Sequence, residues 1–397
     1  MKITRIQSLI ACWLALLALS SSAAQPVAVQ RPLKTVSLQL IWKHQFQFAG
    51  YYMARHKGFY RDAGLDVVIH EYQGDMNPVT DVLQERRDFA VGRSTILADN
   101  ASGAKIVALL AAFQNSPLML LSTADSGISH PKHLRGKNIM MTSDAEHQVE
   151  VLAMLLQSSI SEEDFVRQPH SFRIDSLIDG STDAMASYLS NEPFQMQQQG
   201  EAYHVLHPQD YGFSMYSDIL FTSQAYLSRH PDTVADFRRA SIKGWLYAFS
   251  HIDETIDVIL QHYNTQQRSP AALRFEGETL KSLAFDSEGR FGQLAEDKFN
   301  AMAQLFLLFN LIDKDYNLDN FIYRDRSAPQ VPLSYDEIAF IETVRPLKVC
   351  GVPPWEPFSQ RSNNQDEGII PDYFALIQAR TGLPTETVLT SRRDEAL

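Results

Sequence analysis

The stretch LQLIWKHQFQFAGYYMARHKGFYRDAGLDVVI, residues 38 to 69, decides the fold. An apolar run predicts a strand over Val36–Ile41, and the residues from about Gln47 to Lys57 have the spacing of a helix. Gly58 follows this helix, and a glycine at that position commonly ends helices. A second strand-like run comes next. The order strand, helix, strand predicts an α/β domain in which helices pack on a sheet.

The loop WKHQFQ between the first strand and the helix mixes aromatic and polar side chains. Loops at the carboxyl ends of strands bind ligands in open α/β sheets, because they are exposed and the next helix offers unpaired N–H groups. The alternative is that the aromatic residues only fill the core, and we expect this of Phe46, Phe48, Phe59 and Tyr60. Four residues are expected to bind a ligand: Trp42, His44, Gln47 and Tyr51.

The same alternation of apolar runs and amphipathic stretches continues to about Arg324. It predicts further strands at Leu65–Tyr72, Phe89–Gly92, Ile106–Phe113, Met119–Thr123, Asn138–Thr142 and Ile219–Thr222. Helix starts are indicated at Asn77-Pro78 and by a capping box of Ser143 and Glu146. The pattern becomes mainly helical after Ser223.

A linker with a short helix is predicted over residues 326–345, where Ser334 and Glu337 form a second capping box. A new strand, LKVCGV, begins after Arg345-Pro346. The α/β pattern that starts there has roughly 50 residues, too few to bury a stable core alone. We therefore expect residues 346–397 to be an incomplete second domain.

Residues 1–24 have the features of a cleaved export signal: Lys2 and Arg5, then an apolar run, then small residues before Gln25. The alternative is an uncleaved membrane anchor, for which the apolar run is short. Export implies a periplasmic location. Cys350 is the only cysteine of the mature chain, so no intramolecular disulfide is expected.

The mature chain is acidic, because 33 Lys and Arg remain against 47 Asp and Glu, a net charge of 33 − 47 = −14. An acidic surface gains no attraction from nucleic acid or from an anionic membrane, which argues against both as partners. The composition, with 45% hydrophobic and 21% charged residues, is that of a globular protein. The length suggests more than one domain.

Further polar residues lie at predicted strand ends. Arg93 and Ser94 follow a short buried strand, and Arg93 can bind an anion through two hydrogen bonds or form a surface ion pair. Asn191 and Glu192 suit an amino or amidine group, or alternatively form a helix N-terminus with the glutamate in its first turn. Tyr216 precedes the strand that returns the chain to the first half, and Asn115 lies in the matching outward segment FQNSP.

Motifs of common enzyme classes are absent from the sequence: G-x-S-x-G, the P-loop, G-x-G-x-x-G, H-E-x-x-H and C-x-x-C. The twelve histidines show no convincing metal-ligand spacing. We therefore expect sites that bind rather than react, with no cofactor, no metal and no catalytic residue.

The opening stretch, together with DFAVG, PHSFRIDSLIDGSTDAMASYLSNEPF and DYGFSMYSDILFTS, resembles the periplasmic solute-binding family of sulfonates, nitrate and thiamine-pyrimidine precursors. The resemblance covers about residues 33 to 325 and is nearest to versions fused to sensor kinases and diguanylate cyclases. It implies a two-lobed periplasmic-binding-protein fold of type II, with lobe 1 at about 33–122 and 223–325 and lobe 2 at about 123–222. The chain should cross between the lobes near 121–126 and 218–224.

The family also includes an enzyme that makes the thiamine pyrimidine from pyridoxal phosphate and one of its own histidines, with iron. The place of its cofactor lysine is taken here by Arg93, and that of its substrate histidine by Leu97. Arginine does not form the imine at ordinary pH and leucine has no ring atoms to give. The resemblance therefore implies binding without catalysis.

The tail is similar to a different family. RPLKVCGVPPWEPFSQ and GIIPDYFALIQARTGL resemble the start of amino-acid-type solute-binding domains of hybrid sensor kinases, with Pro353, Trp355 and Phe358 in the matching motif.

The leading hypothesis is a periplasmic module that closes around a small polar or heteroaromatic solute and signals through fused domains. The first alternative is the binding component of an ABC importer, whose partner would be an inner-membrane permease. The second is the pyrimidine synthase.

Overall fold

The computed structural model describes most of the chain after residue 31. The described residues are 32–74, 76–142, 148–313, 316–324, 331, 333–351, 357–358, 360–362 and 365–389. The predicted export signal and the capping box of Ser143 and Glu146 lie outside them, as do Pro353 and Trp355.

Lobe 1 is built on a mixed sheet. In the part of the chain that the structure describes, this sheet has the strand order β2-β1-β3-β10-β4. Strand β1 is parallel to β3, whereas β10 is antiparallel to both β3 and β4. The strands are β1 (Lys34–Gln39), β2 (Leu65–His70), β3 (Phe89–Gly92), β4 (Ile106–Phe113) and β10 (Ser217–Ser223).

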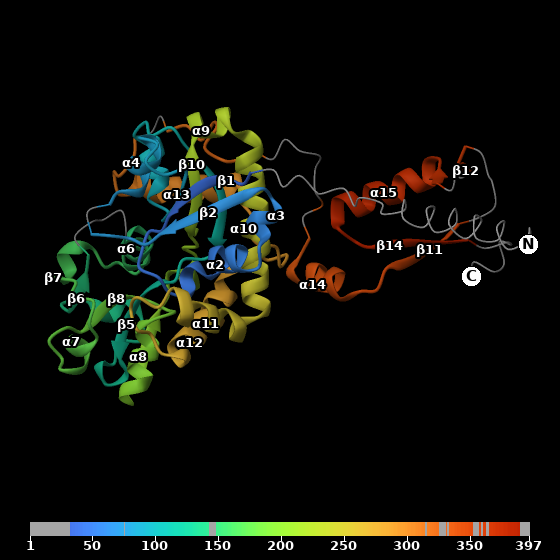
Figure 1. The fold of residues 1–397 in the computed structure, drawn as a ribbon. Coiled ribbons are helices and arrows are strands. Elements are labelled where there is room, and N and C mark those ends of the chain that lie inside the picture. The colour runs from blue at the N-terminus through green and yellow to red at the C-terminus, as the bar shows by residue number, and fades with distance from the viewer. Residues whose placement is uncertain are drawn as a thin grey trace, which may run out of the picture. The chain divides into compact units, whose positions relative to one another are not determined.

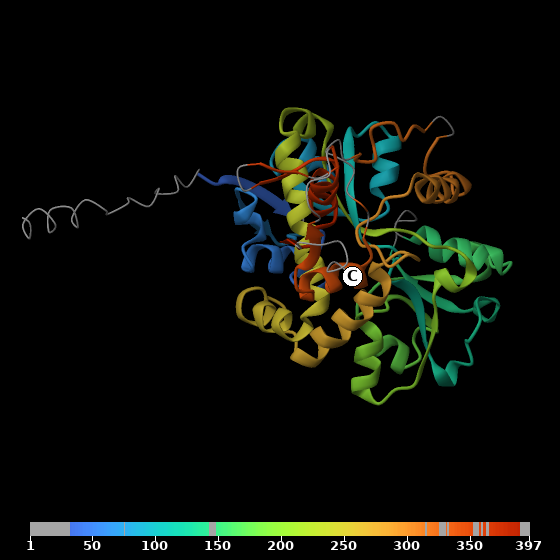
Figure 2. The ribbon, with the colours of Figure 1, turned by 90° about the vertical axis from the view of Figure 1, so that its right-hand side faces the viewer.

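The long helix α10 (Pro231–Ser250) runs alongside this sheet and packs on α2 (Ala49–His56), as both ribbon views show (Figures 1 and 2). Trp245 is fully buried between them. Asn77 caps the next predicted helix, its side chain accepting from the N–H of Thr80 at 2.9 Å. The remaining helices of lobe 1 are α3 (Phe59–Asp62), α4 (Pro78–Leu83), α5 (Ile96–Ala101), α9 (Gln224–Arg229), α11 (Ile252–His262), α12 (Pro270–Ala284) and α13 (Glu296–Leu308).

Lobe 2 has its own sheet, with the order β7-β6-β8-β5-β9 among the described residues. Its elements, drawn in green, are grouped apart from the blue and yellow elements of lobe 1 (Figure 2). The strands are β5 (Leu118–Thr123), β6 (Asn138–Met141), β7 (Val166–Pro169), β8 (Ala184–Tyr188) and β9 (Tyr203–Leu206). The main helices are α6 (Val149–Gln157), α7 (Asp175–Ile178) and α8 (Glu192–Gln199).

The two crossings between the lobes lie earlier in the sequence than the resemblance implied. Strand β5 pairs with β8 and β9 and so belongs to lobe 2, whereas β10 pairs with β3 and β4 and belongs to lobe 1. The chain therefore crosses within residues 113–118 and again just before 217, rather than near 121–126 and 218–224. The segment FQNSP, expected to be the outward crossing, is at the first of these places.

The strands predicted at Phe89–Gly92 and Ile106–Phe113 have those bounds in the structure, and the other predicted strands shift by a few residues. The prediction lacked β7, β8 and β9. Strand β7 carries Arg167, Gln168 and Pro169 and is partly exposed, so its composition does not resemble that of a buried strand. Pro193 lies in the first turn of α8, which its fixed φ favours.

After lobe 1, α14 (Tyr335–Thr343) begins with the predicted capping box of Ser334 and Glu337. The following segment has a parallel pair, β11 (Leu347–Gly351) and β14 (Thr385–Leu389), joined through α15 (Ile369–Thr381). A short hairpin of β12 (Gln360–Ser362) and β13 (Gln365–Glu367) lies between them in sequence. Helix α15 has no buried side chain. That this segment is an incomplete second domain stays a prediction.

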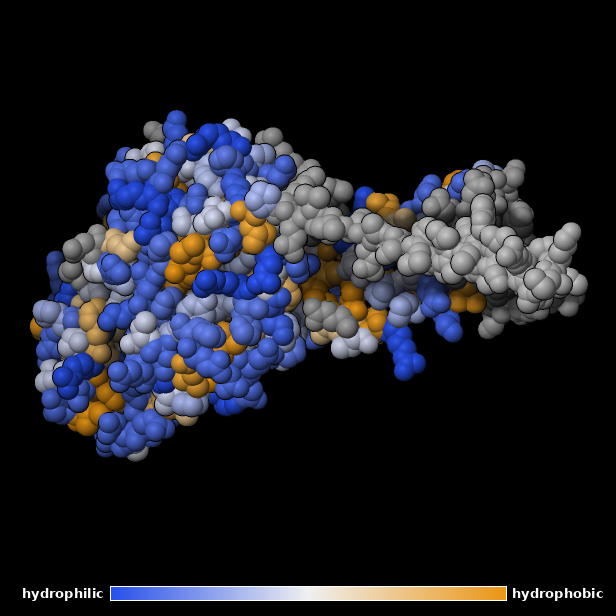
Figure 3. Space-filling view, in the orientation of Figure 1, coloured by the Kyte–Doolittle hydropathy of each residue, from blue (hydrophilic) through white to orange (hydrophobic). Residues whose placement is uncertain are grey.

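The surface seen in Figure 3 is mostly hydrophilic, with small scattered hydrophobic patches. Among the described residues, no helix combines the length and apolarity that a membrane crossing requires.

Two glycines set the distance between α2 and α10. A Cβ atom on Gly244 would overlap the carbonyl oxygen of Gly50 and lie 2.6 Å from Cβ of Ala54. A Cβ atom on Gly50 would overlap the ring of Trp245. The helices therefore approach so closely that neither position has room for a side chain.

We expect Gly244→Ala to lower the free energy of unfolding by about 1–3 kcal/mol, although alanine normally favours a helix, because the two backbones must separate. Chemical denaturation measures this. Gly74→Ala is the control, since its added Cβ would meet no atom within 4 Å. Equal midpoints for Gly244→Ala and the parent would contradict the close packing.

Candidate functional site

The carboxyl ends of β1 and β3 lie at one edge of the lobe-1 sheet. Trp42 and Gln47 follow β1, and Arg93 follows β3. Because β10 is antiparallel to β3, its first residues lie at this same edge: Ile219 pairs with Gly92. Asp218 is thereby placed beside Arg93. Ligands of open α/β sheets bind at such an edge.

Gln47 and Asp218 are both buried and directly bonded: Nε2 of Gln47 donates to Oδ1 of Asp218 at 2.6 Å. The hydroxyl of Ser217 donates to the other carboxylate oxygen at 3.0 Å. Burial raises the pKa of Asp218 to about 6, against the opposing effect of these bonds and of Arg93. Asp218 also has a positive φ of 51°, a conformation that side chains other than glycine adopt at a cost. Asp218 thus combines a buried carboxylate with backbone strain, as residues at functional sites often do.

Glu276 of α12 holds the loop after β1 in place. Its carboxylate accepts from the N–H of Phe46 at 3.3 Å and of Gln47 at 3.0 Å. Glu276 is buried, which raises its pKa to about 7. The cation Arg268 lies 3.8 Å away from Nε to Oε2. A carboxylate at these first N–H groups stabilises the start of the short helix Phe46–Phe48.

The facing edge belongs to lobe 2. Tyr188 ends β8, and Asn191 and Glu192 form the turn into α8. The carboxylate of Glu192 accepts from the N–H of Tyr188 at 2.8 Å and from Nδ2 of Asn191 at 2.6 Å. Burial raises the pKa of Glu192. Glu192 is in the first turn of a helix, which is the alternative that the sequence left open.

Several contacts among the described residues join the two edges, and three of them involve predicted binding residues. Nε of Arg93 donates to the Tyr188 hydroxyl at 3.0 Å, and Nη2 of Arg268 donates to Oδ1 of Asn191 at 2.6 Å. The ring of Trp42 lies 6.4 Å from that of Phe172, centroid to centroid. We call the polar residues that meet here the interlobe cluster: Gln47, Arg93, Tyr188, Asn191, Asp218, Arg268 and Glu276.

Carboxylates outnumber guanidinium groups around the interlobe cluster. Burial raises the pKa of Glu150 on α6, an effect that Arg93 opposes. With Glu192, Asp218 and Glu276 this makes four carboxyl groups beside Arg93 and Arg268 in the part of the chain that the structure describes. Raised pKa values make some of these groups able to donate as well as accept hydrogen bonds near neutral pH.

One predicted binding residue, Tyr51, lies inside lobe 1, and another, His44, is half-buried in the loop after β1 with its ring against lobe 1. Tyr51 is fully buried, with its ring edge-on to Trp245 at 5.7 Å, and is a core residue. His44 bonds through Nδ1 to the Tyr52 hydroxyl at 2.8 Å, and burial lowers its pKa. The helix that carries Tyr51 turns this side chain towards α10, about 100° away from its neighbour.

Two others lie at the crossings. The Ser214 hydroxyl donates to Oδ1 of Asn115 at 2.6 Å, which ties the outward crossing to the return crossing. Tyr216 is buried, and its hydroxyl accepts from the N–H of Ala295 at 2.9 Å. Ser94 is buried in the turn before α5. Of the predicted residues, Trp42, Gln47, Arg93, Asn191 and Glu192 are therefore brought together at the facing edges.

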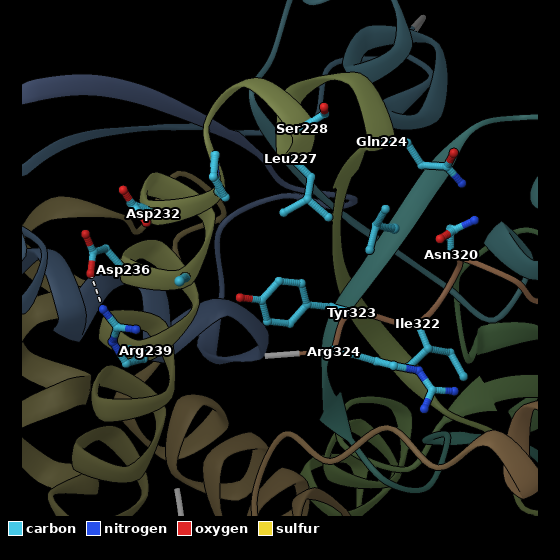
Figure 4. Close-up of a pocket in the computed structure, with 13 residues that line it drawn as sticks. Gln224, Leu227, Ser228, Asp232, Asp236, Arg239, Asn320, Ile322, Tyr323 and Arg324 are labelled. Atoms are coloured by element: carbon cyan, nitrogen blue, oxygen red, sulfur yellow. Dashed lines mark hydrogen bonds and ion pairs between the residues drawn. The ribbon is translucent and has the colours of Figure 1, made fainter. Parts of the chain in front are cut away.

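A cavity of about 910 Å³ lies at the opposite end of the lobe-1 sheet (Figure 4). The ring of Tyr323 points into it, and the ion pair of Asp236 and Arg239 lies on its wall. Its lining residues all belong to lobe 1, from Val107, α9, α10 and residues 320–324. Filling it would not draw the lobes together, so it is not the candidate site.

Sequence reasoning missed Asp218, Glu276, Arg268 and Tyr188. Glu276 left a detectable pattern, because it shares the buried face of α12 with Leu273, Gly277 and Leu280 at helical spacing. Asp218 precedes the apolar strand segment ILF and could also have been noticed. Arg268 lies in the polar loop NTQQRSP, where nothing distinguishes it from a solvated side chain.

Comparison with known proteins gives two similar curated relatives. The riboflavin-binding protein RibY of Chloroflexus aurantiacus is 27% identical over 271 residues, covering 64% of this chain and 75% of the relative. The formylaminopyrimidine-binding protein of Halalkalibacterium halodurans is 24% identical over 299 residues, covering 74% and 89%. Both alignments extend over most of the relative.

Solved structures share the fold. The periplasmic aliphatic sulphonate binding protein SsuA of Escherichia coli superposes with a TM-score of 0.59 at 13% identity, covering 76% of this chain and 96% of that one. This confirms the predicted two-lobed α/β fold of periplasmic binding proteins. The family model described as NMT1/THI5 like matches residues 45–255, more than half of the chain. The chain belongs to the NMT1/THI5-like family.

Proposed function

We propose that this protein binds a small nitrogen heterocycle between its two lobes and releases it unchanged. The observation that carries the proposal is the meeting of two carboxyl-terminal sheet edges, joined through Arg93–Tyr188 and Arg268–Asn191. A solute held there contacts both lobes and favours the closed arrangement, because only that arrangement offers both sets of contacts.

The charge of the site supports a neutral or weakly cationic ligand over a sulfonate. Glu150, Glu192, Asp218 and Glu276 surround two arginines, and each of these carboxyl groups repels an anion whenever it is ionised. Amides and carboxyl groups match the ring nitrogens and amino groups of a heterocycle. The two curated relatives are named for riboflavin and formylaminopyrimidine, which are such compounds. The structural match to a sulfonate-binding protein supports the fold only.

For the biological role we propose sensing, in the periplasm, with the predicted export signal of residues 1–24. The chain continues past the binding lobes into α14 and the β11–α15–β14 segment, which suits a protein that passes closure on to further domains. The second candidate is an importer component, since binding proteins of this fold occur in such systems. Loss of the protein should leave uptake of labelled ligand unchanged, and an uptake defect would favour import.

A thermal-shift and calorimetry panel tests the ligand class: riboflavin, formylaminopyrimidine and an aliphatic sulfonate. We expect a heterocycle to raise the Tm of the parent and the sulfonate to leave it unchanged. Asp218→Asn should weaken heterocycle binding about tenfold or more, because a buried carboxylate partner is lost. Asp236→Asn, on the wall of the distant cavity, is the matched control. Binding of the sulfonate alone would contradict the proposal.

The same variant gives a stability test with a defined pH window. The folded-state pKa of Asp218 is about 6, above its ordinary value of 3.8, so the unfolded chain ionises first as pH rises. The parent therefore loses stability between about pH 4 and 6, by about 3 kcal/mol. Asp218→Asn lacks this loss and should be the more stable protein at pH 7.5, with little difference near pH 4. Denaturation at both pH values measures it.

One lysine side chain contacts both crossings between the lobes. Nζ of Lys298 on α13 donates to the carbonyl oxygen of Gln114 and, at 2.7 Å, to the Ser214 hydroxyl, so one side chain holds both crossings. Its ammonium also lies 4.6 Å from the centre of the Tyr216 ring, and burial lowers its pKa to about 8. A cavity of about 680 Å³ adjoins it, lined by residues of both lobes.

Lys298→Met should speed amide hydrogen exchange at residues 113–117 and 213–217 by about tenfold, because the crossings lose a shared donor. Lys281→Met is the matched control: Lys281 also donates to a carbonyl, that of Phe249 at 3.1 Å, and lies 4.8 Å from the Tyr335 ring, but touches neither crossing. Equal exchange in both variants would contradict the hinge role.

A further inference from the structure

We propose that Phe172 of lobe 2 and Trp42 of lobe 1 clamp the outer ring of a fused, planar heteroaromatic solute. Together with Tyr72 we call these residues the aromatic clamp. Phe172 is then a specificity-determining residue that selects ring systems larger than a single pyrimidine. This inference rests on the proposed function and narrows its ligand class.

Phe172 is held at the facing edge of lobe 2 by its neighbours. It follows β7, whose carboxyl end lies at the same edge as that of β8 because both strands are parallel to β6. Nδ1 of His170 accepts from the N–H of Phe172 at 2.9 Å, and Nε2 of His170 bonds the carbonyl oxygen of Ala186 at 2.6 Å. Phe172 is thus tied to the strand that leads into Tyr188.

Phe172 combines an unfavourable backbone conformation with an exposed ring. Its φ is 59°, which is an outlier for a bulky side chain and is retained mainly at functional positions. Its side chain is also 62% exposed, so the strain is not offset by burial of the ring in the core. A glycine would avoid the strain. The ring of Phe172 also packs against that of His170, with 4.4 Å between ring centres. A phenylalanine held in this way at a binding edge, with an exposed ring, is suited to contact a ligand.

The opposing face is supplied by lobe 1. Trp42 and Tyr72 stack with 5.7 Å between ring centres and 19° between planes, and the N–H of Tyr72 donates to the Trp42 carbonyl oxygen at 3.2 Å. Across the lobes, the Trp42 and Phe172 rings are 6.4 Å apart and tilted by 36°. A planar ring between two aromatic faces needs about 7–8 Å, two contact distances of carbon atoms. An opening of about 1 Å and a small rotation would therefore admit it.

The relative burial of the two parts gives the direction in which the solute extends. Gln47 and Asp218 are buried, whereas Phe172 is at the surface. A solute that bonds the interlobe cluster and also contacts the aromatic clamp must extend from the buried polar end to the exposed aromatic end. A fused bicyclic or tricyclic heterocycle does so rigidly, with little conformational entropy to lose on binding.

Calorimetric titration with riboflavin and with formylaminopyrimidine tests the inference on the parent, Phe172→Gly and Phe172→Ala. We expect the parent to bind riboflavin the more tightly. Both variants should bind riboflavin about tenfold more weakly, through the lost ring contact, and formylaminopyrimidine within twofold of the parent. Phe172→Gly should at the same time raise Tm, because glycine adopts a positive φ without strain. The control is Phe340→Ala, a phenylalanine on α14 that is also mostly exposed.

A gain in stability together with a loss of affinity separates ligand contact from a structural role, which would lower both. Riboflavin affinity equal to the parent's in both Phe172 variants overturns the clamp and leaves the proposed function standing. A parent that prefers the single ring also overturns the clamp. A parent that binds neither compound overturns the proposed function and the clamp with it.

Discussion

The buried carboxylate of Glu276 is the constraint on which the candidate site depends. It accepts from the backbone of Phe46 and Gln47, about 230 positions away in sequence, and so fixes the loop between β1 and α2. Burying an ionisable group in this way is costly unless it is hydrogen-bonded, and here the two N–H groups at a helix start are the partners. The position of Gln47 follows from this contact, and through Gln47 the position of the Asp218 side chain. Gly277, next to Glu276, lets α12 approach closely, since a Cβ there would lie 2.8 Å from the Phe46 ring.

From this anchor the polar contacts continue across the lobes. Arg268 lies between Glu276 and Asn191, so the group that partly balances the buried carboxylate also reaches lobe 2. Lys298 connects the two crossings in a similar way, because its ammonium group donates hydrogen bonds to both connecting segments. At the facing edges and at the crossings, these hydrogen bonds are thus donated by cationic side chains of lobe 1. A solute in the site competes for the first set and leaves the second in place, which is the arrangement expected of a hinged binding protein.

The sequence predicted those features that depend on local pattern, and missed those that depend on distant partners. Strands β3 and β4 are apolar throughout and bounded by turn residues, so their limits were predicted without error. Strand β7 is polar and was missed.

Trp42, Gln47 and Arg93 could be found because they follow recognisable strands. Asn115 and Tyr216 were correctly located near the crossings, but no local pattern distinguishes a hinge contact from a ligand contact. Tyr51 was misplaced because its orientation depends on Trp245, from a helix nearly 200 residues later.

Strand β10 lies between β3 and β4, yet it follows all of lobe 2 in sequence. The order of synthesis and the order of the strands in space therefore disagree. A nascent chain that has emerged only as far as β9 contains all five strands described for lobe 2 but lacks the central strand of lobe 1. Lobe 2 is thus the half whose sheet can assemble first. Strands β3 and β4 each keep one unpaired edge until β10, which pairs with both, has been synthesised. Until the return segment is available, those edges are the part of the molecule most exposed to wrong pairing, and chaperone protection would matter most at that stage.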